Sequence, residues 1–139
     1  MQKIEDLENK RESLYEELSK TGDFRRGIIS LNYRKCGKAN CCCSKEGHPG
    51  HGPQYLWNTT IKGKSYAKNL KLGPELQKYS EEIARSHHFL KMCDELVEIN
   101  ERICDLRPVS EVEDDNELEM LKKKLQKLFL KRRHKRLCK

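Results

Sequence analysis

The chain has 139 residues, of which 35% are hydrophobic and 37% are charged, whereas typical globular domains contain about 25% charged residues. This composition argues against a large enzyme core, and no segment approaches the roughly 20 consecutive apolar residues of a membrane-spanning helix. Lys and Arg number 29 against 22 Asp and Glu. The net charge of +7 that results favours an acidic partner.

Residues 2–20 are expected to form the first helix. Ile4, Leu7, Leu14 and Leu18 fall on one face at helical spacing. Gly22 follows in a Thr-Gly-Asp stop and suits a left-handed cap.

The segment 27–72 has a different composition, rich in Gly, Pro and Asn. Short runs of β-branched and aromatic residues predict strands at 28–33, 54–61 and 65–70. Lys62-Gly63-Lys64 joins the last two runs and is typical of a β-hairpin. We therefore expect a three-stranded antiparallel sheet with one packed face.

A long helix is predicted to run from Pro74 to about Leu106, with proline at its first position. Its apolar stripe alternates three- and four-residue steps, and Leu90, Cys93 and Val97 widen it so that it meets more than one neighbour. Arg107-Pro108 ends the helix. The stripe consists of Phe89, Met92, Leu96, Ile99, Ile103 and Leu106.

Ser110-Glu111-Val112-Glu113 has the spacing of a capping box and predicts the start of a last helix. That helix carries a leucine stripe and ends in a cluster of cations. The fold class is therefore α+β: a small three-stranded antiparallel sheet with a zinc-binding Cys/His loop, flanked by long, coiled-coil-like helices. The predicted parts are an N-terminal helix (1–22), a zinc-binding β-region (23–73), a long helix packed on the sheet and the N-terminal helix (74–107), and an acidic linker with a basic C-terminal helix (108–139).

Seven cysteines follow a start that does not read as a signal peptide. Cysteines without a secretory signal indicate a reducing compartment, and we expect the cytoplasm. The odd number also excludes a complete disulfide framework within one chain. Thiols in such a compartment more often bind metal than pair with each other. Cys93 and Cys104 are expected to be small core residues, and Cys138 a free thiol of the tail.

Four cysteines lie within the eight residues 36–43, and two histidines follow. Zinc favours four tetrahedral sulfur or nitrogen ligands. In extended backbone Cys41 and Cys43 point the same way and Cys42 points opposite. The sequence therefore predicts a structural zinc site of Cys36, Cys41, Cys43 and one histidine. We prefer His51, just before the second strand, and His48 is its competitor; unmetallated thiols or a redox-active cysteine pair are the alternative reading.

The motif Cys-Gly-Lys-x-Asn-Cys-x-Cys at 36–43, followed by His-Gly-Pro at 51–53 and the aromatic Tyr55, resembles that of a family of small bacterial and archaeal proteins of unknown function, often met near transposase genes. The resemblance covers about residues 26–106. It implies that Cys36, Cys41, Cys43 and His51 are the shared metal ligands and that Cys42 falls on a variable position. It also implies a mobile-element setting. A weaker likeness in pattern links the hairpin and following helix to the arm-site DNA-binding domains of tyrosine recombinases, whose sheet enters the major groove; here Lys62, Lys64, Lys68 and Asn69 would face outward.

Charge is unevenly distributed along the chain. Residues 21–72 have a net charge of +8 and residues 120–139 of +10, while 1–20 and 73–119 together have −11. The two basic blocks predict nucleic-acid binding, with DNA favoured and RNA possible. Interleaved aromatics could stack on unpaired bases, although Tyr55 and Trp57 suit the core of the sheet better. The predicted contact residues are Arg25, Arg26, Arg34, Lys35, Lys38, Lys62, Lys64, Lys68, Lys131, Arg132, Arg133, Lys135 and Arg136.

Two other interpretations compete with nucleic-acid binding. The basic C-terminal helix could fold back on the acidic segments, or the helical stripes could form an assembly module that binds a partner protein without nucleic acid. The two functions are compatible in an accessory protein that docks on a larger mobile-element protein or on itself. We expect no enzymatic activity, because no nucleophile–base spacing or phosphate loop is present, and no membrane binding, because the apolar face of the last helix is narrow.

Overall fold

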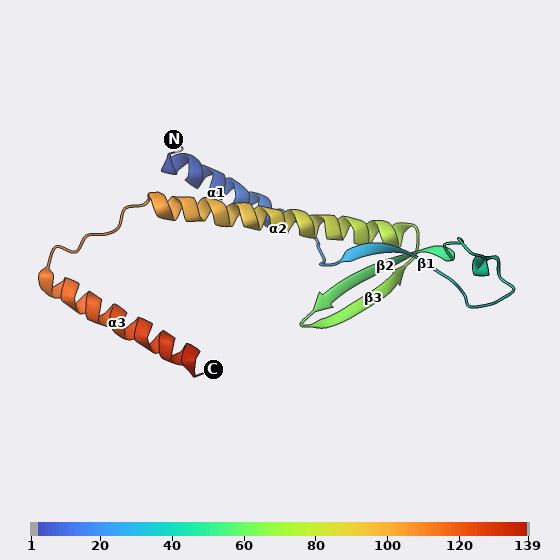
Figure 1. Cartoon of the computed structure of the whole chain (residues 1–139). Coiled ribbons are helices and arrows are strands. Elements are labelled where there is room, and N and C mark those ends of the chain that lie inside the picture. Colours follow the sequence, from blue (N-terminus) through green and yellow to red (C-terminus); the bar gives the residue numbers. More distant parts are fainter. Residues whose placement is uncertain (1–2, 139) are drawn as a thin grey trace. The chain divides into compact units, whose positions relative to one another are not determined.

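The computed structural model describes residues 3–138. It is an α+β protein that divides between Cys104 and Asp105 into two compact units. The elements, in chain order, are α1 (Ile4–Ser19), β1 (Ile28–Arg34), the short 3-10 helix η1 (Cys42–Ser44), β2 (His51–Ile61), β3 (Lys64–Leu70), α2 (Pro74–Leu106) and α3 (Asp115–Leu137) (Figure 1). The predicted helices and the three-stranded antiparallel sheet are therefore present.

The apolar core of the first unit lies between α1 and α2. Leu7 and Leu14 of α1 pack against Met92, Ile99 and Ile103 of α2, and all five are buried. These residues belong to the two stripes that the sequence predicts, and burying them holds α1 along the second half of α2 (Figure 1).

The edges of the α2 stripe depart from the prediction. Leu90 and Val97 are 53% and 54% exposed, and Leu106 is 49% exposed. Cys104 is also exposed and Cys93 is half-buried, so the expectation that both are core residues is wrong for Cys104. The reason is that α1 covers one face of α2 only, and these side chains lie outside that contact.

The sheet has the strand order β1-β2-β3, and both pairs are antiparallel. Trp57 in the central strand pairs with Ile29 of β1 and Lys68 of β3. Its indole meets the ring of Tyr79 on α2 edge-on, with 5.5 Å between centroids. Side chains alternate between the two faces of a strand. The face that contains Trp57 packs on α2, and the residues before and after Trp57 in the strand have their side chains on the outer face.

The β2–β3 connection is a two-residue hairpin loop. Lys62 and Gly63 have φ values of 50° and 79°, which is the pattern of a type I′ turn. Ile61 pairs directly with Lys64 across this turn. The hairpin that the sequence predicts therefore forms, with register fixed by the turn.

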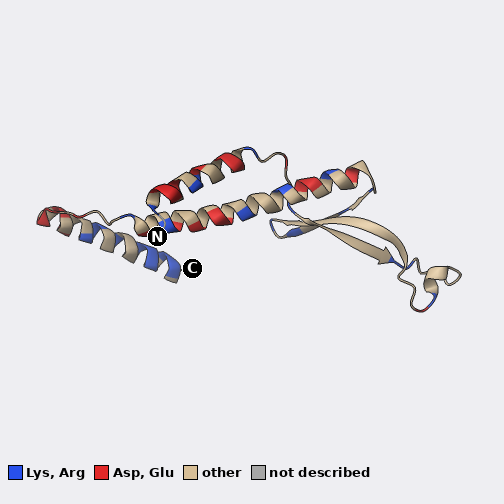
Figure 2. Ribbon diagram, turned by 90° about the horizontal axis from the view of Figure 1, so that it is seen from above, with Lys and Arg blue, Asp and Glu red and all other residues tan. Residues whose placement is uncertain are grey.

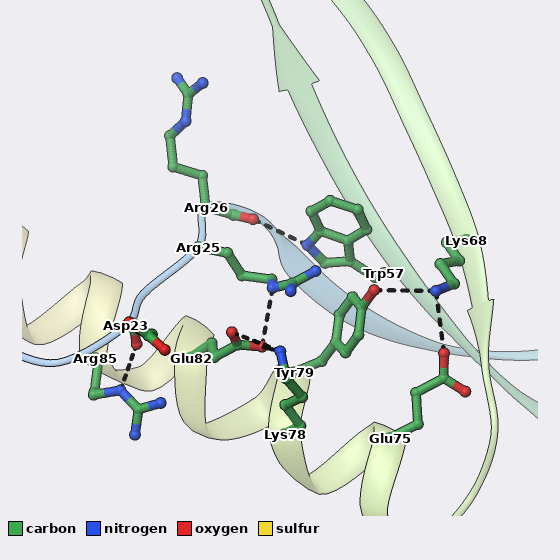
Figure 3. A network of polar contacts seen from close by, with 10 residues as sticks. All are labelled: Asp23, Arg25, Arg26, Trp57, Lys68, Glu75, Lys78, Tyr79, Glu82 and Arg85. Atoms are coloured by element: carbon green, nitrogen blue, oxygen red, sulfur yellow. Dashed lines mark hydrogen bonds and ion pairs between the residues drawn. The ribbon is translucent and has the colours of Figure 1, made fainter.

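A polar cluster attaches the sheet to the first half of α2 (Figure 3). Arg25 Nε lies 3.1 Å from Glu82 Oε1, and the Arg25 guanidinium stacks over the Tyr79 ring at 3.7 Å from its centroid. On the other side of the ring, Lys68 Nζ donates to the Tyr79 hydroxyl at 3.1 Å and pairs with Glu75 at 3.2 Å. Buried charge is tolerated when it is paired, and here the paired groups come from three separate segments.

The acidic segment before α3 is not helical, and the predicted capping box at Ser110 is wrong. The helix begins at Asp115, and the N-cap is Asp114, whose side chain accepts a hydrogen bond from the Asn116 backbone N–H at 2.9 Å. Asp is as good an N-cap as Ser, and Asp114 is followed three residues later by Glu117. The capping pattern therefore occurs twice in this segment, at Ser110–Glu113 and at Asp114–Glu117. Local spacing alone therefore does not distinguish a helix that begins after Ser110 from one that begins after Asp114.

Among the residues that the structure describes, no helix combines the length and the apolar character needed to cross a membrane.

Candidate metal centre and basic surface

The Cys/His loop joins the end of β1 to the start of β2. His51, the first residue of β2, pairs with Arg34 at the end of β1. The ladder therefore brings the two ends of the loop 35–50 together. Gly50 is required at this point, because a Cβ there would lie 2.7 Å from the Arg34 carbonyl carbon and its φ is +106°.

Backbone hydrogen bonds shape the loop into a compact turn. The Cys41 N–H donates to the Lys38 carbonyl at 3.2 Å, and the Ser44 N–H donates to the Cys41 carbonyl at 3.0 Å. Ser44 Oγ donates to the same Cys41 carbonyl at 2.6 Å. Cys43, inside η1, is 1% exposed, so the turn directs this thiol inward.

The four predicted ligands lie together in the structure. The thiol sulfurs of Cys36, Cys41 and Cys43 and a ring nitrogen of His51 are all within 4.8 Å of one another. Cys36 Sγ is 3.4 Å from Cys43 Sγ, and Cys41 Sγ is 3.1 Å from His51 Nε2. The sulfur–sulfur edge of a tetrahedral zinc site is about 3.8 Å, from Zn–S bonds of about 2.3 Å. The donors and their separations therefore fit a single four-coordinate metal ion.

Backbone N–H groups favour the thiolate form at two of the three cysteines. A hydrogen bond from the Lys38 backbone, followed by one from the His51 side chain, lowers the pKa of Cys36. The Cys43 backbone lowers the pKa of Cys41 in the same way. At Cys43 the Cys36 backbone also acts to lower the pKa, but burial and the neighbouring thiols outweigh it and raise the pKa. Because thiolates are the metal-binding form, these N–H groups prepare the site for a cation.

Cys42 and His48 lie outside the group. Cys42 is exposed, and the backbone N–H of Gly50 donates to His48 Nδ1 at 3.0 Å. The sequence excludes Cys42 on two grounds, extended backbone and its variable position in the family motif. The first ground is wrong, because Cys42 and Cys43 lie in a 3-10 turn, but Cys42 is outside the group as expected. The preference for His51 over His48 agrees with the group that the structure assembles.

The predicted cationic residues have two different environments. Arg25 and Lys68 are engaged inside the first unit with Glu82, Glu75 and Tyr79. Lys68 also lies on the face toward α2, and not on the outer face that the recombinase likeness predicts. Lys64 is four residues before Lys68 in β3 and has the same orientation in the strand, so that prediction is wrong for Lys64 as well, although Lys64 is exposed at the hairpin end. The remaining ones are exposed: Arg26, Arg34, Lys35, Lys38, Lys62, Lys64, Lys131, Arg132, Arg133, Lys135 and Arg136.

Figure 2 shows this division of charge within each unit. Acidic residues recur along α1 and α2, the strands contain none, and Lys and Arg residues concentrate toward the end of α3. Between residues 27 and 72 the only acidic residue is Glu46. The sheet and its Cys/His loop thus form a positively charged surface on a unit whose helices are acidic.

The polar cluster around Arg25 is not among the features that the sequence predicts. Glu82 and Ser86 are the buried polar residues of α2, at 7% and 1% exposure. A signal existed in Lys78 and Glu82, an i,i+4 pair with 3.0 Å between Nζ and Oε2. Nothing local pointed to Arg25, which lies in a different segment.

The fold and the cluster define a small α+β protein with a Cys3His group that could hold a metal ion. The chain belongs to the family described as domain of unknown function DUF6788, whose model matches residues 4–85. Comparison with curated proteins and with solved structures gives no match. The matched segment contains α1, the sheet, the Cys/His loop and the polar cluster, whereas α3 lies beyond it.

Proposed function

We propose that this protein is a zinc-stabilised, nucleic-acid-binding accessory factor with DNA as its favoured ligand. The observation that carries the proposal is the charge of the sheet region: segment 27–72 has a single acidic residue against eight cations. Cations on a rigid surface bind phosphates and release counterions, which gives most of the affinity for DNA. Seven of them are exposed and are not held in the Tyr79 cluster: Arg34, Lys35, Lys38, Lys45, Lys62, Lys64 and Lys71. The eighth, Lys68, is engaged with Glu75 and Tyr79.

Zinc is the metal that we assign to the Cys3His group. Thiolates and imidazole are the ligands of structural zinc, and four protein ligands leave no open position for a reacting water. The loop has one buried side chain, Cys43, among residues 35–49, so it has little apolar core of its own. A structural zinc, worth on the order of 10 kcal/mol, supplies the missing stabilisation. This role is structural, and we expect no enzymatic activity.

The C-terminal helix adds a second basic surface. Residues 120–139 contain ten cations and no acidic residue, and α3 buries none of its residues. Exposed Tyr33 and Tyr66, at 47% and 49% exposure, could stack on unpaired bases. Single-stranded DNA and RNA are therefore the competing ligands to include in any binding experiment.

The biological setting that we propose is a mobile element. The support is the likeness of the Cys-Gly-Lys…His-Gly-Pro motif to proteins often met near transposase genes. An accessory factor of this kind would bind nucleic acid near a larger transposase or recombinase, and would act in the cytoplasm.

Helix-mediated assembly is the second candidate function. Leu90 and Val97 are spaced by seven residues on α2 and are both more than half exposed. On α3, Leu121, Leu125 and Leu128 are 41% to 42% exposed. Such stripes are typical of helices that pack on a partner or on a second copy. Sedimentation of the chain alone distinguishes a monomer from a self-associated form.

The zinc assignment is tested by elemental analysis of the purified chain. We expect one zinc per chain, lost in Cys41→Ser and retained in Cys42→Ser, because only Cys41 belongs to the group. The two cysteines are adjacent, so this pair is a matched control for the chemistry of the substitution. Metal-free protein that is fully folded would contradict the assignment.

Nucleic-acid binding is tested by measuring affinity against salt for duplex DNA, single-stranded DNA and structured RNA. Six phosphate contacts give a log–log slope of about −5 on duplex DNA. Lys62→Gln and Lys64→Gln should each reduce the magnitude of this slope by about 1 without changing the zinc content. Absence of binding at low salt would leave assembly as the function.

A further inference from the structure

The outer face of the sheet is uncharged and rich in side-chain amides. In each strand its residues alternate with the residues whose side chains face α2, and the pairing register places them side by side across the three strands. Asn32 of β1 pairs with Gln54 of β2, and Leu56 of β2 pairs with Asn69 of β3. The other positions of this face in β2 and β3 are small or polar, and none carries a charge: Asn58, Thr60, Ser65 and Ala67.

Three of these amides have no partner within the part of the chain that the structure describes. No hydrogen bond there engages the side chains of Asn32, Gln54 or Asn69, and all three are exposed. Asn58 is different, because its Nδ2 donates to Ser30 Oγ at 2.7 Å and to the Leu56 carbonyl at 3.3 Å. The free amides are thus available for an external ligand, while Asn58 belongs to the sheet.

The free amides surround a shallow hollow. This hollow has a volume of about 310 Å³ and is lined by Asn32, Gln54 and Asn69 together with the apolar Leu56 and Ala67; Tyr33 and Arg34 complete its edge. An apolar surface bordered by carboxamides matches an A·T base pair in the major groove. Asn and Gln pair with N6 and N7 of adenine, and apolar groups contact the thymine methyl.

The dimensions and charges of the sheet also suit duplex DNA. Three strands spaced by about 4.8 Å place the outer strands about 10 Å apart, against a major groove about 12 Å wide. Exposed cations lie at both ends of the strands: Lys62 and Lys64 at the hairpin, and Arg34 and Lys35 at the other end. The face between them contains amides and no acidic group, so phosphates would meet the ends and bases the middle.

We propose that the outer face of the sheet reads A·T base pairs in the major groove of duplex DNA through Asn32, Gln54 and Asn69. This inference rests on the proposed DNA-binding function and adds to it a sequence preference and the residues that create it. The lysines at the hairpin position the sheet on the backbone, and the three amides distinguish the bases.

The experiment is a selection by the full zinc-loaded chain from a pool of duplexes with a central random segment of about 12 base pairs. We expect enrichment of A·T steps and an affinity for the enriched duplex about 100-fold above that for the starting pool. Replacing adenine in the enriched duplex by 7-deazaadenine, which lacks the N7 acceptor in the major groove, should lower the affinity for that duplex about tenfold.

Single variants separate base reading from backbone binding. Gln54→Ala and Asn69→Ala should each lower the preference about tenfold and leave affinity for the unselected pool unchanged. Gln77→Ala, an exposed amide on α2, should change neither quantity, whereas Lys62→Gln should weaken binding to all duplexes alike. Circular dichroism and zinc content verify that each variant is folded.

The inference is overturned if the chain binds duplex DNA with a salt-dependent affinity but enriches no sequence, or if the preference survives Gln54→Ala and Asn69→Ala. In those outcomes the proposed DNA binding stands and the base-reading role does not. If the chain binds no duplex even at low salt, the proposed function itself fails, and the inference fails with it.

Discussion

Arg25 and Arg26 are neighbours in the sequence with opposite expected roles, and exchanging each for methionine separates fold from function. Arg25 pairs with the buried Glu82 and stacks on Tyr79. The side chain of Arg26 extends away from this cluster, and only its backbone carbonyl is engaged, by the Trp57 indole N–H at 2.9 Å (Figure 3). We expect Arg25→Met to destabilise the protein and Arg26→Met to weaken DNA binding.

The magnitude follows from the contacts of Arg25. Removing one partner of a buried ion pair costs about 3–5 kcal/mol, and the lost cation–π contact adds about 1 kcal/mol. Lys78 remains 3.0 Å from Glu82, although its side chain is 63% exposed, and it compensates for part of the loss. The net cost of Arg25→Met is therefore about 2–4 kcal/mol. In a unit of this size that lowers Tm by about 10–25 °C.

Arg26→Met should change the free energy of unfolding by less than about 0.5 kcal/mol, because the side chain is exposed and makes no contact that folding requires. If Arg26 contacts a phosphate, the slope of log affinity against log salt falls in magnitude by about 1. Arg25→Met, measured where it is still folded, should leave this slope unchanged.

The assays are denaturant unfolding and duplex binding across a salt series, performed on both variants. A third variant, Arg25→Met with Glu82→Gln, should be more stable than the sum of the two single losses predicts, because no unpaired carboxylate remains. If Arg25→Met is as stable as the natural chain and reduces the magnitude of the salt slope, Arg25 acts on the ligand and not in the fold, which contradicts the role assigned to it.

Three further predictions concern the acid limit of stability, the Cys/His loop and the packing of the sheet. A hydrogen bond from Lys78, with the charge of Arg25 nearby, lowers the pKa of Glu82 in the folded protein. The ionised Glu82 carboxylate therefore contributes its full stabilisation of the fold above the unfolded pKa of about 4.3, and this contribution is lost as pH falls through the lower folded pKa. Glu82→Gln should flatten the dependence of unfolding free energy on pH below about 5, measured by denaturant titration. Chelation of the metal should expose residues 35–50 to trypsin while helical circular dichroism persists, and equal protection with and without chelator would contradict a structural metal. Gly27→Ala should cost more than about 2 kcal/mol, because its Cβ would lie 2.4 Å from Trp57 Nε1 at a φ of +124°; calorimetry gives the value, and an unchanged Tm would show that the indole can move aside.

The elements could be predicted because each has a local cause. The Lys62-Gly63 turn and the flanking β-branched residues define the hairpin, and the apolar spacing of α1 and α2 identifies the faces that form the core. The four cysteines and histidine could be grouped because zinc chemistry restricts the donors, and the β1–β2 ladder then brings His51 to the thiols.

What the sequence did not show depends on pairing between distant segments. Glu82 is 57 residues from Arg25, so no local pattern connects them, and the sequence predicts Arg25 as a nucleic-acid contact instead. The recombinase likeness predicts that Lys68 and Asn69 both face outward, although neighbouring residues of a strand point to opposite sides. Only the packing of Trp57 on Tyr79 decides which of the two faces α2.

The sheet is small enough that its attachment determines what it can do. One helix covers one face, and the polar cluster around Tyr79 fixes the sheet to α2 through charged and aromatic contacts more than through aliphatic ones. At the start of β2 the Cys3His group joins the ends of the loop. These two attachments involve the inner face and the loop, and they do not engage the side chains of Asn32, Gln54 and Asn69 on the outer face. A three-stranded sheet with an exposed face gains little stability from that face. Residues on the outer face are therefore free to serve ligand recognition, and the absence of acidic side chains among them is consistent with an anionic ligand.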